Sequence, residues 1–237
     1  MENLLTVISD YGEYLIPIIF FSIAISIIAY SFFFSNKNII IREFKKGRRK
    51  SINSIRDKEY VKIIGVAKHV NTPLVAPLSG RSCVYYHIVV EVKGDKSWRR
   101  IINDVKSQDF FIESSTEMAI IKTKFLEKNT SICHLVKDYK ENSGFRNDAN
   151  NKLEAYLKSH NKKSTGFLGI NKTIRYTEGI IELNEKIGVK GIAKWQSLKE
   201  PIVGYSYSKI LTLEGTKKQK LLITDEPKAL IRVQNKI

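Results

Sequence analysis

Cysteine is scarce in this chain of 237 residues, which has only Cys83 and Cys133. Two cysteines exclude a framework of several disulfides, and they exclude a zinc module built from many cysteine ligands. A single bridge between the two would need an oxidising compartment. The four histidines are scattered along the chain, at positions 69, 87, 134 and 160. We therefore expect neither a metal site nor a cofactor.

The motifs of common catalytic and nucleotide-binding sites are also missing. The sequence contains no Walker loop, G-x-G-x-x-G, H-E-x-x-H or G-x-S-x-G. Cys83 is a candidate nucleophile with His87 as its base, but on a strand rising about 3.3 Å per residue the two would lie about 13 Å apart. That separation disfavours a hydrogen bond between them. We interpret Cys83 as a buried core residue and assign no catalytic residue, and an enzymatic role remains the alternative.

Acidic residues are in the minority, with 24 Asp and Glu against 40 Lys and Arg, which gives a net charge of +16. Such a surplus favours anionic partners: phospholipid headgroups, nucleic acid or an acidic protein. Aromatic residues stand beside basic ones at Trp98 and Phe145, as in some surfaces that stack single-stranded nucleic acid. The basic residues are nevertheless spread through the chain and form no nucleic-acid-binding motif. A domain facing a membrane explains the charge more simply, and nucleic-acid binding remains an alternative.

One long hydrophobic run is present, YLIPIIFFSIAISIIAYSFFF at residues 14–34, and it contains no charged residue. About 20 apolar residues in a helix span the hydrocarbon core of a bilayer. A cleaved signal peptide and a buried core helix are the alternatives. A signal peptide has basic residues before its apolar stretch, whereas here Glu2, Asp10 and Glu13 precede the run and the basic residues follow it. We predict a single transmembrane helix over 14–34 after an N-terminal tail, 1–13.

Basic residues after a membrane span mark its cytoplasmic side. We therefore predict an external N-terminus, a basic juxtamembrane linker over 35–58 and a cytoplasmic domain over 59–237. Within the linker, five cations are expected to lie on the membrane surface against anionic phospholipid headgroups, at about 1 kcal/mol each. The alternative is that they only set the topology. These residues are Lys45, Lys46, Arg48, Arg49 and Lys50.

The chain beyond residue 58 is rich in β-branched and aromatic runs separated by turn residues. Strands are expected within 59–70, 81–94, 97–114, 116–127, 131–141 and 172–195, and a short helix around 149–160. Residues 208–227 are expected to form a hairpin around the loop EGTKKQ, and Pro227 suits the first turn of a terminal helix. The fold class predicted is mainly β with a minor α component, an antiparallel barrel or sandwich with one short helix.

Several short motifs of this domain occur in a recognisable order. They are GVA (65–67), APLSG (76–80), CVYY (83–86), RYTEG (175–179), GVKG (188–191) and LITDEP (222–227). In this order they resemble the GIDE domain, also described as a "beside a membrane" domain, of mitochondrial membrane-anchored ubiquitin ligases and their bacterial relatives. The ligases also carry a second transmembrane helix and a RING, and two cysteines cannot form a RING.

The resemblance therefore implies a membrane-apposed β domain for protein interaction, with a ubiquitin-ligase-like transferase as the alternative. It also suggests a groove that binds a partner peptide or a lipid headgroup. The residues expected to line that groove are Pro73, Pro77, Ser79, Gly80, Arg175 and Glu178. The function predicted is a membrane-anchored, non-catalytic interaction or scaffold module whose protein partner is unknown.

Overall fold

The structure is a computed structural model that describes residues 2–47, 49–122, 124, 126, 129–166, 169–198 and 205–231, with the backbone alone at 2–13 and 15. Strands dominate it, as the sequence predicts. The helices are α1 (Glu2–Phe33), α2 (Asn36–Lys45), the 3₁₀ helix η1 (Ile52–Ser54), α3 (Asn151–Ser159) and α4 (Pro227–Leu230). The strands are β1 (Tyr60–His69), β2 (Leu74–Val75), β3 (Ser82–Lys93), β4 (Trp98–Ser107), β5 (Phe110–Ser114), β6 (Glu117–Ile121), β7 (Ser131–His134), β8 (Tyr139–Ser143), β9 (Ile174–Glu182), β10 (Lys186–Ser197), β11 (Lys209–Glu214) and β12 (Leu221–Thr224).

Five strands close into a small barrel in the order β1-β5-β6-β11-β10, because β10 pairs back to β1. Strands β12 and β7 extend the sheet from β10. Every second residue of a barrel strand points inward, as the period of two in a strand requires. Along β1 these inward residues are Val61, Ile63 and Ala67, and along β10 they are Ile187, Val189 and Ala193. The barrel core is therefore built from small and branched apolar side chains.

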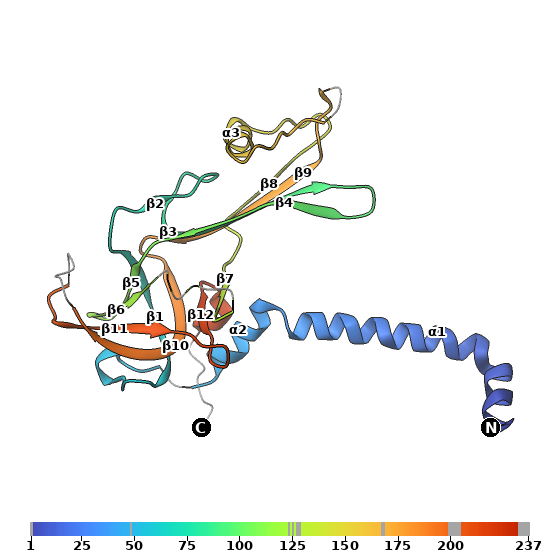
Figure 1. Cartoon of the computed structure of the whole chain (residues 1–237), viewed down its shortest axis with the longest axis horizontal. Helices are drawn as coiled ribbons and strands as arrows, with labels where there is room; N and C mark the ends of the chain where they lie inside the picture. Colours follow the sequence, from blue (N-terminus) through green and yellow to red (C-terminus); the bar gives the residue numbers. More distant parts are fainter. Residues whose placement is uncertain are drawn as a thin grey trace.

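A second sheet lies above the barrel in Figure 1 and consists of β2, β3, β9 and β8, with β4 also paired to β3. Helix α3 covers its upper face through Leu153, Tyr156 and Leu157. At one end its lower face packs on the barrel through Val84, Tyr85 and Ile181. The rest of the sheet extends past the barrel, and Figure 1 shows the β3–β4 hairpin projecting from it. The molecule thus has three layers: barrel, sheet and helix.

The expected hairpin at 208–227 is wrong. Strands β11 and β12 do not pair with each other; both lie antiparallel along the same edge of β10, β11 against 192–197 and β12 against 188–190. They form one interrupted strand from which residues 215–220 loop out. Each segment also has a parallel neighbour, β6 for β11 and β7 for β12. Two apolar stretches joined by a polar loop look alike in the sequence whether they pair with each other or lie one after the other along one edge of a third strand.

The N-terminal region is not divided into the tail over 1–13 and the helix over 14–34 that the sequence predicts. Residues 2–13 are helical and continuous with the apolar stretch, so Pro17 lies inside α1 rather than in a first turn. Figure 1 shows a bend in the N-terminal part of α1. The window Ile16–Phe33 is long and apolar enough to cross a membrane, and none of it is buried in the protein.

The predicted linker is also corrected, because much of it belongs to the folded domain. Helix α2 packs on β12, β7 and α4 through Ile40 and Phe44, which are 0% and 2% exposed. Lys62 Nζ donates to the Phe44 carbonyl oxygen at 2.6 Å, and Lys190 Nζ donates to that of Glu43 at 2.8 Å. These two largely buried lysines satisfy the free carbonyls at the C-terminal end of α2 and complement the helix dipole. The β domain therefore begins at α2.

Candidate functional site

Residues 73–80 contain the short strand β2 and the compact turn that leads from it toward β3. Strand β2 pairs with the start of β3, with Leu74 opposite Cys83. The Gly80 N–H donates to the Ala76 carbonyl at 2.8 Å, and the Ala76 N–H donates to the Arg81 carbonyl at 2.9 Å. Gly80 has φ of +76°, a left-handed conformation that glycine adopts without strain. The sequence APLSG therefore closes a rigid turn on the edge of the second sheet.

Glu178 on β9 holds this turn from beneath. Its side chain is fully buried, and its two carboxylate oxygens accept hydrogen bonds from the backbone N–H groups of Leu78 at 3.0 Å and Ser79 at 2.9 Å. A buried carboxylate is tolerated when its lone pairs are satisfied in this way. The carboxylate of Glu178 thus positions the loop, and a binding partner would contact the loop rather than Glu178.

The structure brings five of the six predicted groove residues together. Pro73, Pro77 and Ser79 are partly exposed and Gly80 is exposed, all on the turn held by Glu178. Arg175 does not join them. It lies on β9 three residues before Glu178, an odd spacing that puts the two side chains on opposite faces of the sheet. Arg175 instead pairs with Glu91 at 2.6 Å.

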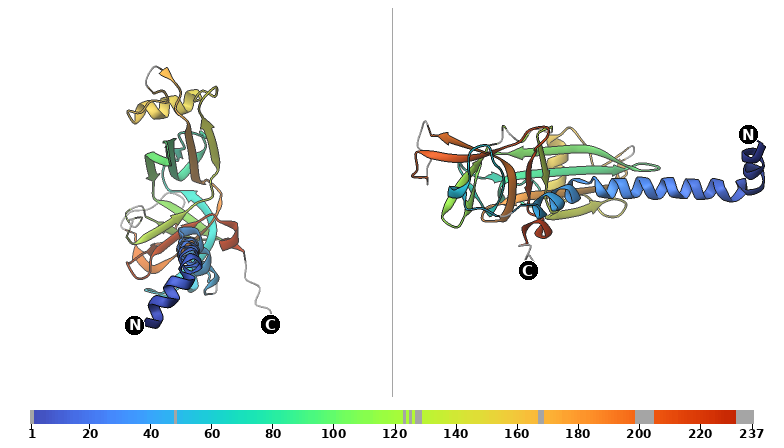
Figure 2. Two further views of the ribbon diagram at one scale, coloured as in Figure 1. Left: turned by 90° about the vertical axis from the view of Figure 1, so that its right-hand side faces the viewer. Right: turned by 90° about the horizontal axis from the view of Figure 1, so that it is seen from below.

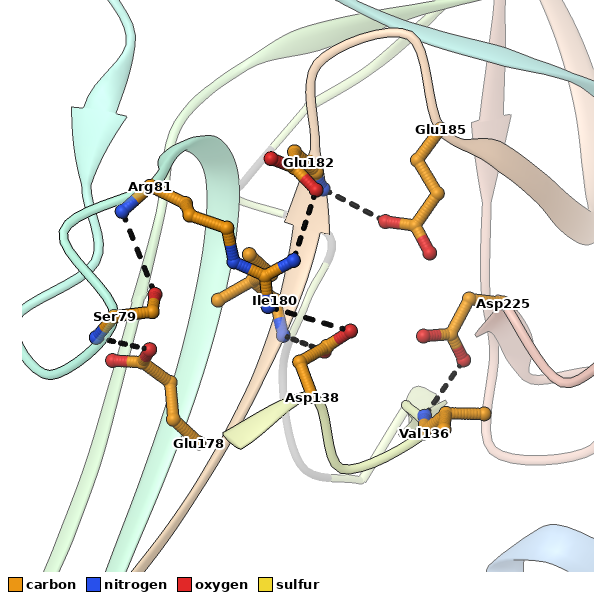
Figure 3. A network of polar contacts seen from close by, with 9 residues as sticks. All are labelled: Ser79, Arg81, Val136, Asp138, Glu178, Ile180, Glu182, Glu185 and Asp225. Carbon is orange, nitrogen blue, oxygen red and sulfur yellow. Dashed lines mark hydrogen bonds and ion pairs between the residues drawn. The ribbon is translucent and has the colours of Figure 1, made fainter. Parts of the chain in front are cut away.

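A network of acidic residues continues from the loop toward the barrel (Figure 3). Arg81, directly after the turn, points between two carboxylates: its guanidinium nitrogens lie 3.1 Å from Glu182 Oε2 and 3.6 Å from Asp138 Oδ1. Asp138 also accepts the Ile180 N–H at 3.0 Å. Glu185 accepts the Glu182 N–H at 2.8 Å. The network ties the β7–β8 connection and the β9–β10 turn to the loop.

Two carboxyl groups of this region titrate far from their usual range. Burial, with the charges of Asp225, Asp138 and Glu182, raises the pKa of Glu185 to about 7, against the backbone hydrogen bond that lowers it. Burial also raises the pKa of Asp225 to about 6. Asp225 Oδ1 accepts the Val136 N–H at 2.8 Å, whereas its other oxygen is buried and has no hydrogen-bond partner among the residues that the structure describes. The arrangement can hold a proton near neutral pH between the two sheets.

Sequence reasoning missed this acidic cluster. Its acidic members come from three separate segments, the β7–β8 connection, the end of β9 with the β9–β10 turn, and the residue after β12, and Arg81 joins them from just before β3. No local spacing joins them, because only the contact of the second sheet with the barrel brings them together. The EK and TDEP turn sequences around Glu185 and Asp225 are typical of solvated turns, so the sequence gives no signal of their burial.

Cys83 is fully buried among the residues beneath α3, as its interpretation as a core residue requires. Burial and the neighbouring Glu178 charge raise the pKa of its thiol to about 11. The proposed base is engaged elsewhere, because His87 Nε2 lies 2.9 Å from Asn103 Oδ1. Burial likewise raises the pKa of Cys133 to about 12. Both thiols are therefore protonated at neutral pH, and a thiol is a poor nucleophile.

The cations predicted to meet the membrane surface turn partly toward the barrel. Lys46 pairs with Glu43 at 2.5 Å, Lys50 pairs with Glu59, and an Arg49 guanidinium nitrogen lies 3.3 Å from the Ile64 carbonyl oxygen. Lys45 is exposed in the last turn of α2, and Arg48 lies outside the described residues. Ten residues of α2 separate this cluster from the end of α1, about 15 Å of helix.

Searches against protein-family models, curated proteins and solved structures found no match to this chain. The class of protein that fold and site define is therefore a structural one: a small closed β-barrel joined to a helix-covered sheet and carrying one exposed apolar helix.

Proposed function

We propose that this protein is a membrane-anchored, non-catalytic interaction module, in which α1 spans the bilayer and the β domain is a GIDE-like domain apposed to it. The observation that carries the proposal is the complete exposure of the apolar window Ile16–Phe33 on a helix that projects away from a folded domain. A largely apolar helical window of 18 residues left in water would be costly, and a bilayer is the environment that removes the cost.

The anchor is joined to the domain by contacts that fix its direction. The Asn38 side-chain amide donates to the Phe32 carbonyl at 2.7 Å, and the Arg42 guanidinium donates to the Phe33 carbonyl at 2.5 Å. The same guanidinium lies 3.9 Å from the centroid of the Phe33 ring. These two side chains of α2 satisfy carbonyls at the end of α1 that the helix leaves free. We call this junction the elbow (Phe32 to Arg42).

The surface proposed to bind the protein partner is the turn over residues 73–80. Val75 is 63% exposed on β2, which lies at an edge of the second sheet. An edge strand offers unpaired backbone groups, and an extended peptide can add to it. Glu178 keeps the turn rigid, so little conformational entropy would be lost on binding. The occupant that fits is an extended peptide with an apolar side chain opposite Val75.

The anchor is tested by alkaline carbonate extraction of membranes from cells that express the full chain. Retention in the membrane pellet, together with protease resistance of the β domain in intact cells, supports a single span with the domain inside. Release into the supernatant contradicts the proposal. A product trimmed after α1 would identify a signal sequence.

The partner surface is tested by a photo-crosslinking amino acid at Val75, with the same group at Val105 as the control. Val105 is also exposed, at 49%, but lies on β4 away from the turn. We expect an adduct of defined mass from position 75 that is absent from position 105. Equal adducts from both positions would contradict a specific surface at the turn.

A further inference from the structure

The β3–β4 hairpin projects from the domain on the same side as α1. Figure 1 shows the hairpin extending past the barrel, so that its tip lies above α1 and at a distance from it, and the view from below in Figure 2 shows the hairpin and α1 extending in the same direction. The elbow holds α1 in this direction through Asn38 and Arg42. If α1 crosses a bilayer, the hairpin tip is therefore the part of the β domain directed at it.

Strand register defines which side chains of the hairpin face α1. Helix α3 covers the upper face of the sheet, and α1 lies below it (Figure 1). Glu91 is paired with Arg100 on one side and Arg175 on the other, and Lys93 is paired with Trp98. Paired residues share a face, as do residues two apart on a strand. We call the lower surface formed by Lys93, Trp98, Arg100 and Arg175, together with Lys96 in the turn beyond them, the tip face.

The composition of the tip face is that of a membrane interface. Lys93, Lys96 and Arg100 are exposed, and no ion pair is found for them among the described residues. Arg175 stacks over the Trp98 ring at 4.3 Å from its centroid, which keeps the indole at the surface beside a cation. Tryptophan favours the headgroup level of a bilayer, and lysine and arginine favour anionic lipids. Asp95 and Glu91 leave the surface with an excess of positive charge.

We propose that the tip face is a second membrane contact, which docks on anionic phospholipid headgroups of the bilayer that α1 spans. This inference rests on the proposed function, because it needs α1 in the membrane. The charged tip cannot enter the hydrocarbon core, so α1 tilts until the elbow and the tip face reach the same interface. Membrane helices tilt by about 20° on average and by up to about 40°. The two contacts together hold the β domain in one orientation on the membrane.

The test uses the full chain reconstituted in vesicles and the fluorescence of Trp98, with Trp195→Phe to leave one tryptophan. Lipids brominated on the acyl chain near the headgroup quench a tryptophan that reaches the interface. The tip variant is Lys93→Glu with Lys96→Glu. The matched control is Arg56→Glu with Lys58→Glu, the same charge change at two exposed positions in the segment between η1 and β1.

We expect quenching of Trp98 in vesicles with phosphatidylglycerol, weaker quenching with phosphatidylcholine alone, and loss of the difference at high salt. Each basic residue at an anionic surface strengthens association about five-fold. The tip variant loses two such residues and should therefore weaken docking at least about 25-fold. The control variant should behave as the parent.

Two results would overturn the inference in distinguishable ways. If the chain stays in the vesicles after carbonate treatment but Trp98 is quenched equally in both lipids and in both variants, the tip face does not dock and the anchor remains supported. If the chain separates from the vesicles altogether, both the anchor and the tip contact are excluded.

Discussion

Glu178 Oε2 lies 2.9 Å from the backbone nitrogen of Ser79, across 99 residues of sequence. Through this contact and its partner at Leu78, a fully buried carboxylate on a central strand fixes the conformation of an edge loop. The loop is therefore a rigid feature of the second sheet rather than a flexible connection. Arg81 then links the same loop to the acidic network at the barrel, so the loop and the junction of the two sheets are one connected structure.

Replacement of Glu178 tests the rigidity of the turn. Glu178→Gln keeps the shape but replaces one carboxylate acceptor by a donor that faces a backbone N–H. We expect a loss of about 2 kcal/mol in the free energy of unfolding, because a buried donor is left unpaired. Denaturant unfolding of the full chain in detergent measures the loss, and faster amide exchange at residues 78 and 79 locates it. Glu113→Gln, in a surface pair with Lys68, is the control, with an expected loss below about 1 kcal/mol.

The protonation of Glu185 predicts how stability depends on pH. Its pKa is raised from 4.5 to about 7, so the folded state binds the proton more tightly than the unfolded state. The stabilisation from that proton is fully present below about pH 4.5 and is lost as pH rises through about 7. We expect the unfolding midpoint to fall across this window and then level off. Asp225, raised to about 6, adds to the lower part of the same decline.

Glu185→Gln separates the effect of Glu185 on the pH dependence of stability from that of the other titratable groups. The amide mimics the protonated acid and can still accept the Glu182 N–H. The variant should unfold with a flatter pH profile and should be more stable than the parent above pH 7 by about 1 kcal/mol, a figure that allows for the partial exposure of this side chain. A variant with the same slope as the parent would show that Glu185 titrates normally.

The two thiols predict a simple chemical outcome. Because burial raises the pKa of Cys83 to about 11, it should not react with iodoacetamide at neutral pH until the protein unfolds. Cys83→Ala should cost about 1 kcal/mol of stability, the size typical of a core substitution, and should leave the fold intact. Mass spectrometry of native and denatured samples measures the labelling. Rapid native labelling at Cys83 would favour the alternative of a reactive cysteine and a transferase.

The sequence predicts the mainly β fold because its signals are local. Alternation in β1 and β10, the turn residues of 73–80 and the apolar positions of α3 each depend on neighbours a few residues apart. The exposure of the apolar run in α1 follows in the same way from its length and lack of charge. The core role of Cys83 was also accessible, from its place in a run of β-formers.

Other features depend on contacts that no local pattern encodes. The β11–β12 segment looks like a hairpin because its pairing partner, β10, lies outside the window that suggests a turn. Arg175 and Glu178 look like neighbours in sequence, yet the pleat of β9 sends them to opposite faces. The many basic residues around α2 made it look like a solvated linker in the sequence. Ile40 and Phe44 are nevertheless buried, because α2 packs on the surface of the folded β domain.

Phe44 provides the decisive test of how α1 and α2 are joined to the β domain. Its ring fills the space above Gly188, where an added Cβ would lie 2.4 Å from the ring and 2.9 Å from Leu230. Phe44→Ala should cost about 3–5 kcal/mol, the usual loss for a fully buried ring, and should free α2 together with the elbow. Phe145→Ala removes the same group at a site 78% exposed and should change stability by less than about 0.5 kcal/mol.

Gly188→Ala should displace the Phe44 ring and reproduce the loss. Limited proteolysis of the full chain in detergent would show new cleavage near residues 46–51 in Phe44→Ala and Gly188→Ala, and an unchanged pattern would mean that α2 is held to the barrel by its lysine contacts instead.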